Sequence, residues 1–226
     1  MPGRTHTFIT GGVYHVYNRS IEGKKILTLE ALCNKFLQIM WYYRSTASLL
    51  RLSNLFRLGN VFKKTYLKTV EDNSTFRVSI LAYCLMPTHY HLLLRQNKNG
   101  GISHYVSQIQ NSFTRYSNVK QKRSGPLFIH RFQSKPVVSD EVFKHVSRYI
   151  HLNSYSSGIV DNVFSYAWSS LHEYMEGGNP KWRLCDTVPL LQLFNQDKER
   201  YKKFILNNAD YQKTLEICKY ADRSHL

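Results

Sequence analysis

Two β-rich runs separated by a proline constrain the fold more than any other feature of the chain. Residues 76–85 alternate apolar side chains with others, which is typical of a strand, and residues 89–96 form a second such run. Met86-Pro87-Thr88 separates the two runs, and proline ends a central strand because it has no N–H to donate. The sequence therefore predicts a β-hairpin over residues 76–96.

The second strand of this hairpin begins with His89-Tyr90-His91. Side chains alternate between the faces of a strand, so the two histidines share one face and Tyr90 lies on the other. Two imidazoles on one face can share a divalent cation. A pair this short also arises in strands that bind no metal, so it does not establish a site by itself.

Periodicity divides most of the chain into strands and helices. Thr28 is a candidate N-cap for the first helix, and Ser139 or Asp140 for the last one. The predicted order is strand, helix, strand, strand, helix, strand, helix, over residues 12–19, 28–43, 76–85, 89–96, 102–116, 127–138 and 139–152.

The first six of these elements predict an α+β fold, a ferredoxin-like split βαβ sandwich with an antiparallel sheet. We expect the hairpin strands at or near the centre of the sheet, helices on one face, and the other face free to hold a site. The last helix follows the last strand and offers further side chains to that site.

Two segments lie outside this pattern. Residues 46–75 are basic and irregular, and they form either a helical extension or a loop that touches nucleic acid; a merely solvated face is equally consistent with them. Gly177-Gly178-Asn179-Pro180 is the best boundary candidate. We therefore expect a main domain over residues 1–176 and a mostly helical extension over residues 177–226.

Positive charge dominates the composition. The 226 residues include 31 Lys and Arg against 15 Asp and Glu, a net charge of +16. Such an excess favours a polyanionic partner, most simply nucleic acid, and the 16 Tyr and 12 Phe add rings on which single-stranded bases could stack. A membrane-surface protein would also be basic, but the chain has no strongly amphipathic basic helix.

The four cysteines, Cys33, Cys84, Cys185 and Cys218, are widely spaced, which argues against a disulfide framework or a zinc ribbon. No stretch is long and apolar enough to span a membrane, and the first residues lack the apolar core of a signal peptide. These features favour a cytoplasmic location and no membrane partner.

The last predicted helix carries Tyr149 and Asn153, which are four residues apart and therefore share a helical face. An amide oxygen from Asn153 could complete the shell of a cation held by the two histidines, beside the phenol of Tyr149. A phenol with a pKa near ~10 needs activation and a strongly polarised electrophile, such as a metal-bound phosphate in DNA. Tyr149 also has helical spacing from Val142 and Val146, so a core tyrosine is the alternative.

Several motifs, taken in order, resemble the single-tyrosine HUH transposases of the IS200-like superfamily, and most closely the branch of REP-associated tyrosine transposases. Each motif is weak alone, and their order from about residue 11 to 175 makes the resemblance fairly specific. The matching segments are Tyr14-His15-Val16 with Arg19, residues 85–94, Gly125-Pro126-Leu127-Phe128 leading to Arg131-Phe132, Tyr149-Ile150-His151-Leu152-Asn153, and Trp168-Ser169-Ser170.

The resemblance implies that His89 and His91 bind Mg²⁺ or Mn²⁺, that Asn153 occupies the third ligand position, and that Tyr149 is the nucleophile. Tyr149 would attack a scissile phosphate of single-stranded DNA, form a 5′-phosphotyrosine link and release a 3′-hydroxyl, and a later 3′-hydroxyl would reverse the step. The family recognises its DNA through an imperfect hairpin, and its members include both monomers and dimers, so a homodimer stays open. The branch commonly has proline after the asparagine where this chain has Ser154, so the helix can run longer here.

Other side chains receive secondary roles. Tyr105 and Tyr116 fit the apolar stripe of the preceding helix, and His151 lies off the helical face of Tyr149 and is expected to be peripheral. The candidate DNA contacts are basic residues whose alternative is solvated surface charge: Arg19, Lys122, Arg123, Arg131 and Lys135.

Three functions are consistent with this sequence. The first is a metal-dependent enzyme that cleaves and transfers single strands of DNA. The second is a domesticated nucleic-acid-binding protein that kept the fold and lost transposition. The third is a metal-dependent phosphodiesterase with water as the nucleophile, which would form no protein–DNA adduct.

Overall fold

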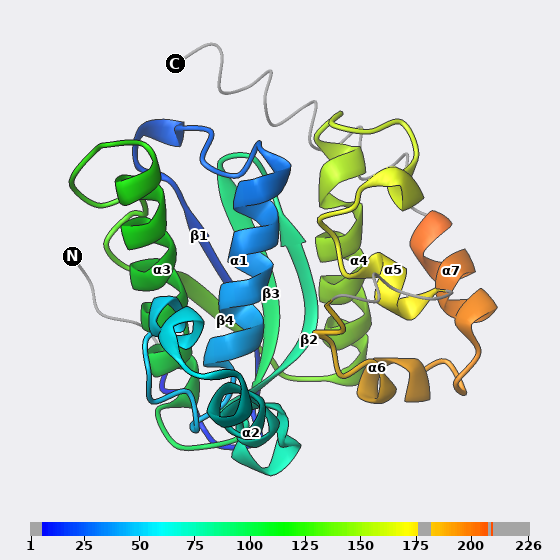
Figure 1. The fold of residues 1–226 in the computed structure, drawn as a ribbon. Coiled ribbons are helices and arrows are strands. Elements are labelled where there is room, and N and C mark those ends of the chain that lie inside the picture. The colour runs from blue at the N-terminus through cyan, green and yellow to red at the C-terminus, as the bar shows by residue number, and fades with distance from the viewer. Residues whose placement is uncertain (1–5, 176–181, 208, 210–226) are drawn as a thin grey trace.

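The computed structural model describes residues 6–175, 182–207 and 209. A four-stranded antiparallel sheet lies at its centre in the order β2-β3-β1-β4 (Figure 1), which confirms the predicted α+β class. The strands are β1 (Val13–Arg19), β2 (Val78–Leu85), β3 (His89–Gln96) and β4 (Gln133–Val137).

The predicted hairpin is confirmed as β2 and β3, but only β3 lies inside the sheet. β2 is an edge strand, because β1 pairs with the other side of β3. The outer backbone of β2 is covered by later segments: Asp186 donates its N–H to Ile80 O at 2.8 Å, and Ser170 donates to Tyr83 O at 2.9 Å. These bonds use backbone groups that an open edge would expose.

One face of the sheet is covered by α1 (Glu30–Tyr43) and α3 (Gly101–Lys120). Phe36 and Phe113 pack there against Tyr90, the middle residue of the His-x-His motif. The predicted cap Thr28 is wrong: Leu29 is the N-cap, and its carbonyl accepts from Leu32 and Cys33, so helical bonding begins one residue later.

The prediction that the other face is free is wrong, because α4 (Asp140–Ser156) and the helices after it cover it. Leu93, Ala82 and Cys84 present apolar atoms on that face, and they join a core with Ile150 and Leu152 of α4. Burial of this second apolar face is the physical reason for the cover. The later helices are α5 (Leu171–Tyr174), α6 (Val188–Gln192) and α7 (Lys198–Leu206).

The cap at the start of α4 and its length follow from the residues at its two ends. The Ser139 hydroxyl accepts from Val142 N, and the acidic Asp140 and Glu141 occupy the first turn. With Ser154 in place of a proline, the helix continues three residues past Asn153 to Ser156. Its length therefore agrees with the expectation that it runs longer than the branch pattern.

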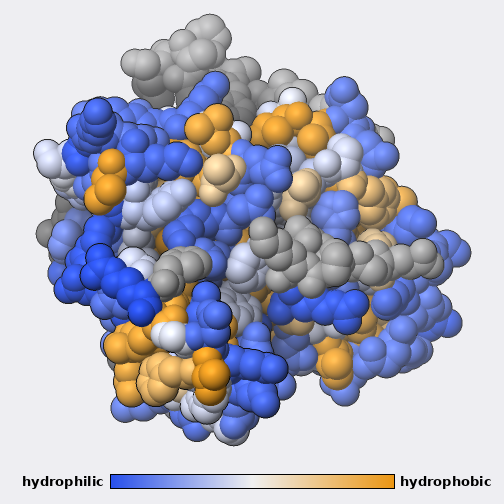
Figure 2. All heavy atoms as spheres, in the orientation of Figure 1, coloured by the Kyte–Doolittle hydropathy of each residue, from blue (hydrophilic) through white to orange (hydrophobic). Residues whose placement is uncertain are grey.

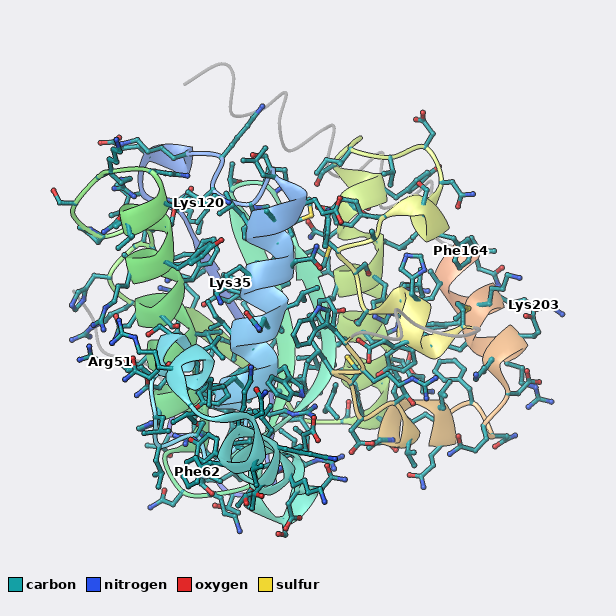
Figure 3. All side chains as sticks on the ribbon, viewed as in Figure 1. Lys35, Arg51, Phe62, Lys120, Phe164 and Lys203 are labelled. Atoms are coloured by element: carbon teal, nitrogen blue, oxygen red, sulfur yellow. The ribbon has the colours of Figure 1, made fainter. Side chains whose placement is uncertain are left out.

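Residues 46–75 form a helical extension. Short 3₁₀ turns, Leu52–Arg57 and Asn73–Thr75, flank α2 (Asn60–Glu71), which lies at the end of the sheet where β2 begins (Figure 1). Val61 and Phe62 of α2 expose apolar side chains, and an orange patch lies at the lower left of Figure 2, where Figure 3 labels Phe62.

The predicted strand over residues 127–138 is mostly wrong. Only Gln133–Val137 joins the sheet, because the chain first runs beside the residues that follow β1. There Ser20 bridges Phe128, and Ile21 N donates to Leu127 O at 2.9 Å. Two further 3₁₀ turns cover Ile21–Gly23 and Val163–Ser165.

The predictions on the cysteines and on membrane spans concern the whole chain. Cys33, Cys84 and Cys185 are free thiols, and Cys218 lies outside the described residues. Within the described part of the chain, no helix has the length and apolarity to cross a membrane. The boundary predicted at residues 177–180 also lies outside the described residues.

Candidate functional site

The two histidines of β3 face α4. In the antiparallel register Arg19 lies opposite His89 and Tyr17 opposite His91, so all four side chains share one face of the sheet. The His89 and His91 rings are 5.0 Å apart between centroids, and His91 is only 6% exposed.

Tyr90 is fully buried on the opposite face, as predicted. Its hydroxyl accepts from Gln110 Nε2 at 2.6 Å. Tyr105 is fully buried too, and Tyr116 is half-buried on the same helix, so both lie on the face of the sheet away from the histidines.

Helix α4 brings Tyr149 to the histidines. Its ring centroid lies 5.3 Å from that of His91, and the side chain is half-buried. Asn153 is one turn further along α4 and is 7% exposed. The fold thus joins two segments nearly 60 residues apart in sequence into one cluster of two imidazoles and a phenol.

A third imidazole belongs to this cluster, and sequence reasoning missed its role. His15 on β1 is buried, its Nε2 lies 3.0 Å from Nδ1 of His91, and its ring centroid is 5.8 Å from that of Tyr149. The signal was present in the alternation of β1, which puts His15 on the same face as Tyr17. The pairing of β1 with β3, which brings His15 to His91, could not be predicted from the sequence.

Burial keeps His15 and His91 neutral. It lowers the pKa of His15 to about 4, with a smaller contribution from the positive charge of Lys135. The pKa of His91 also lies well below its usual value, first because of burial and then because His15 and His89 are close. A neutral imidazole is the form that binds a metal ion.

Each histidine of the motif has its Nδ1 engaged by a neighbour. Thr88 Oγ1 lies 3.0 Å from His89 Nδ1, and His15 holds His91 Nδ1. Partners of this kind fix the orientation and tautomer of metal-binding histidines. The Nε2 atoms are therefore the nitrogens through which both rings would reach a cation.

The chemistry of the donor set fits a cation only in part. Among the described residues no group of three or more His, Cys, Asp or Glu is arranged to hold a metal ion. Imidazole and amide donors such as those of His89, His91 and Asn153 carry no negative charge, and none of the four strands contains an Asp or Glu. Mg²⁺ and Mn²⁺ prefer further oxygen donors, which a bound phosphate could supply.

The five predicted DNA contacts lie in three places. Arg19 lies beside His89, and Lys135 of β4 lies opposite His15, so these two exposed cations flank the histidines. Arg131 is exposed before β4. Lys122 and Arg123 are in the turn after α3, outside the cluster.

The prediction that His151 is peripheral is wrong: its side chain is fully buried. Its Nδ1 lies 2.7 Å from the Tyr201 hydroxyl and its Nε2 2.8 Å from Ser170 Oγ. Burial lowers the pKa of His151 to about 3. The reason is that α5 and α7 cover this side of α4, which sequence periodicity alone does not indicate.

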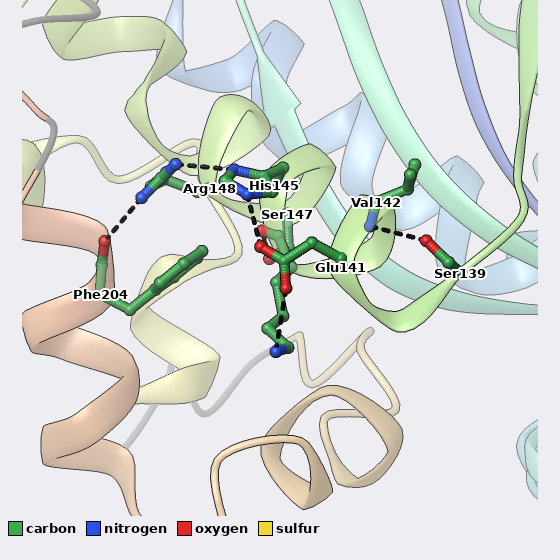
Figure 4. Close-up of polar contacts among 8 residues, drawn as sticks. Ser139, Glu141, Val142, His145, Ser147, Arg148 and Phe204 are labelled. Atoms are coloured by element: carbon green, nitrogen blue, oxygen red, sulfur yellow. Dashed lines mark hydrogen bonds and ion pairs between the residues drawn. The ribbon is translucent and has the colours of Figure 1, made fainter.

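A second set of polar contacts holds the outer side of α4, as Figure 4 shows. Glu141 Oε1 lies 2.7 Å from His145 Nε2, and Arg148 donates to His145 Nδ1 at 2.7 Å. Arg148 also lies over the Phe204 ring of α7, 4.3 Å from its centroid. Contacts on both sides of α4 thus fix the helix that carries Tyr149.

Comparison with known proteins gives a family and a similar fold. A family model described as "Transposase IS200 like" matches residues 37–153. No curated protein matches. Among solved structures, a REP-associated tyrosine transposase bound to a REP hairpin has a TM-score of 0.55 at 16% identity, with 83% of this chain and 93% of that chain covered.

Proposed function

The chain belongs to the IS200-like transposase family, and on that basis we propose that it cleaves and rejoins single-stranded DNA through Tyr149. The observation that carries the proposal is the cluster itself: the Tyr149 ring lies 5.3 Å from His91, at the face of β3 that presents both histidines. Tyr149 is half-buried, so its hydroxyl can be accessible to a substrate.

In this proposal the Tyr149 oxygen attacks the phosphorus of a scissile phosphate. A bond forms from the phenol oxygen to phosphorus, and the bond from phosphorus to the 3′-oxygen breaks. The phenol proton leaves and the 3′-oxygen takes up a proton, so the products are a 5′-phosphotyrosine and a 3′-hydroxyl. The reverse reaction with another 3′-hydroxyl joins strands, and no nucleotide is consumed because the link conserves the energy of the phosphodiester.

His89 and His91, with Asn153, would hold the Mg²⁺ or Mn²⁺ of the family. A divalent cation there would polarise the phosphate and stabilise its developing charge. The protein's own contribution is to keep His91 neutral through burial and to orient both imidazoles through the Nδ1 contacts of His15 and Thr88.

The proposed substrate is a single strand that carries a hairpin. The solved neighbour is bound to a REP hairpin, and this chain has a net charge of +16 to attract phosphates. Arg19 and Lys135, exposed beside the histidines, would contact the backbone next to the scissile phosphate.

Tyr149→Phe tests the nucleophile. Incubation with a hairpin-bearing oligonucleotide and Mn²⁺ should give a covalent adduct with the wild type, and mass mapping should locate it on Tyr149. The Tyr149→Phe variant should bind the DNA with similar affinity and form no adduct. Tyr116→Phe is the matched control, since Tyr116 lies on the other face of the sheet, and it should react like the wild type.

Other results would favour the alternative functions. Binding without cleavage in both Mg²⁺ and Mn²⁺ would favour a domesticated binding protein. Cleavage with turnover and no adduct would favour a phosphodiesterase that uses water. Adducts that persist in the Tyr149→Phe variant would overturn the assignment of the nucleophile.

A further inference from the structure

An open hollow of about 600 Å³ lies at the C-terminal end of α3, apart from the histidine cluster. The last turns of α3 and the turn after it form its walls, near Lys120 in Figure 3. One valine and six polar residues line it: Asn111, Thr114, Arg115, Asn118, Lys122 and Arg123.

The chemistry of this lining favours an anion. Every polar side chain in it can donate a hydrogen bond, and three of them are cations. Residues 73–139 contain no Asp or Glu but nine Lys or Arg. Arg115, Lys122 and Arg123 take part in none of the ion pairs among the described residues, so their charge is not neutralised by the protein.

The walls of the hollow are fixed by local bonds. Asn118 Nδ2 donates to Gly125 O at 2.8 Å and Arg123 N donates to Asn118 O at 3.0 Å, which folds the turn back on the helix. Lys122 has a φ of 50°, a left-handed conformation that is rare for lysine. Asn118 Oδ1 is buried and lacks a hydrogen-bond partner within the described chain.

The hollow lies at the same end of the sheet as the histidines. The turn that closes it leads to Leu127 and Phe128, which pair with Ile21 and Ser20 directly after β1. Arg19, the last residue of β1, lies opposite His89. Figure 1 shows the end of α3 beside this end of β1, so a strand that leaves the histidines past Arg19 can reach the hollow around the end of the sheet.

We propose that this hollow binds backbone phosphates of the DNA outside the scissile nucleotide, an inference that rests on the proposed DNA substrate. Phosphate is favoured over bases because the lining has cations and donors but no aromatic ring on which a base could stack. Binding there is therefore independent of base sequence. It assigns a contact role to Arg115, which no motif of the sequence singled out.

The test is the salt dependence of DNA binding by the double variant Arg115→Gln, Lys122→Gln. Both side chains are exposed, and a thermal melt would verify that the variant is folded. The plot is of the logarithm of the binding constant against the logarithm of the salt concentration. Each phosphate that the protein no longer neutralises makes its slope less steep by about 0.7 on single strands and about 0.9 on duplex. Two lost phosphate contacts should therefore make the slope less steep by about 1.4 to 1.8 relative to the wild type.

The matched control is Lys64→Gln, Lys68→Gln, which removes the same charge from exposed positions on α2, where β2 begins. Its slope should stay at the wild-type value. An unchanged slope in the α3 variant, or an equal fall in the control, would overturn the proposal. Oligonucleotides with the hairpin alone or the single-stranded flank alone show which part of the DNA supplies the phosphates.

Adduct formation separates this inference from the proposed function. At saturating DNA the α3 variant should form the Tyr149 adduct at the wild-type rate, because the hollow is apart from the histidine cluster. If no protein forms an adduct but the slope still falls, the proposed chemistry is wrong and the phosphate site stands. If adducts form normally and the slope does not change, the reverse holds.

Discussion

At the scale of single residues, His15 decides how His91 is presented. The two rings have nitrogens 3.0 Å apart, and both are buried. His15→Leu removes the partner of His91 Nδ1, and removal of such a partner typically lowers metal affinity 10- to 100-fold, so we expect a decrease of about that size. Electron paramagnetic resonance of bound Mn²⁺, in the Tyr149→Phe background with DNA present, measures it.

His15→Gln should restore most of that affinity, because an amide can again hydrogen-bond His91 Nδ1. His104→Leu is the control, since His104 is exposed on α3 across the sheet. Equal Mn²⁺ affinity in His15→Leu and the wild type would show that His15 only fills space.

The residue scale also shows what sequence could and could not predict. Strand alternation correctly separated Tyr90 from His89 and His91, because side-chain direction in a strand is a local property. The contact of His15 with His91 could not be predicted, since it depends on the pairing of strands 76 residues apart. For the same reason His151 was placed outside, although its partners Ser170 and Tyr201 make it part of the core.

At the scale of elements, α4 is positioned by the helices that follow it. The Tyr201 hydroxyl of α7 lies 2.7 Å from His151 Nδ1 and donates to Ser147 Oγ at 3.3 Å. Tyr201→Phe leaves these buried groups with one partner fewer, so we expect the free energy of unfolding to fall by about 1–3 kcal/mol. Urea denaturation measures the change.

Tyr116→Phe serves as the control for this prediction, because its hydroxyl makes no hydrogen bond within the described chain. Its unfolding free energy should stay within about 0.5 kcal/mol of the wild type. An unfolding free energy of Tyr201→Phe equal to that of the wild type would mean that Tyr201 stabilises α4 through its ring alone.

Elements themselves were well predicted where their signal is local. The hairpin, α1, α3 and α4 follow from periodicity and turn residues. The edge position of β2 was not predicted, because it depends on which side of β3 pairs with β1. The cover on the second face was not predicted, because it depends on how α4 and the helices after it pack on the sheet. The fold class could be predicted from the sequence, but the covering of the site by α4 and the later helices could not.

At the scale of the whole molecule, charge separates the site from its surroundings. The net charge is +16, and the sheet that carries the histidines has no carboxylate. His89, His91 and Asn153 would contribute only neutral donors, so a divalent cation there would keep its full charge. A phosphate of the substrate is then the group that neutralises it.

It follows that metal and DNA should bind cooperatively. In the Tyr149→Phe variant, we expect Mn²⁺ affinity to rise about 5- to 150-fold when the hairpin oligonucleotide is bound, and DNA affinity to rise by the same factor with Mn²⁺, because linkage is reciprocal. Titrations with and without the other ligand measure both factors, after subtraction of Mn²⁺ bound by the oligonucleotide alone. The double variant His89→Ala, His91→Ala should still bind DNA but lose the coupling. Tight Mn²⁺ binding that DNA leaves unchanged would mean that the protein supplies the negative charge itself, and would contradict a neutral donor set.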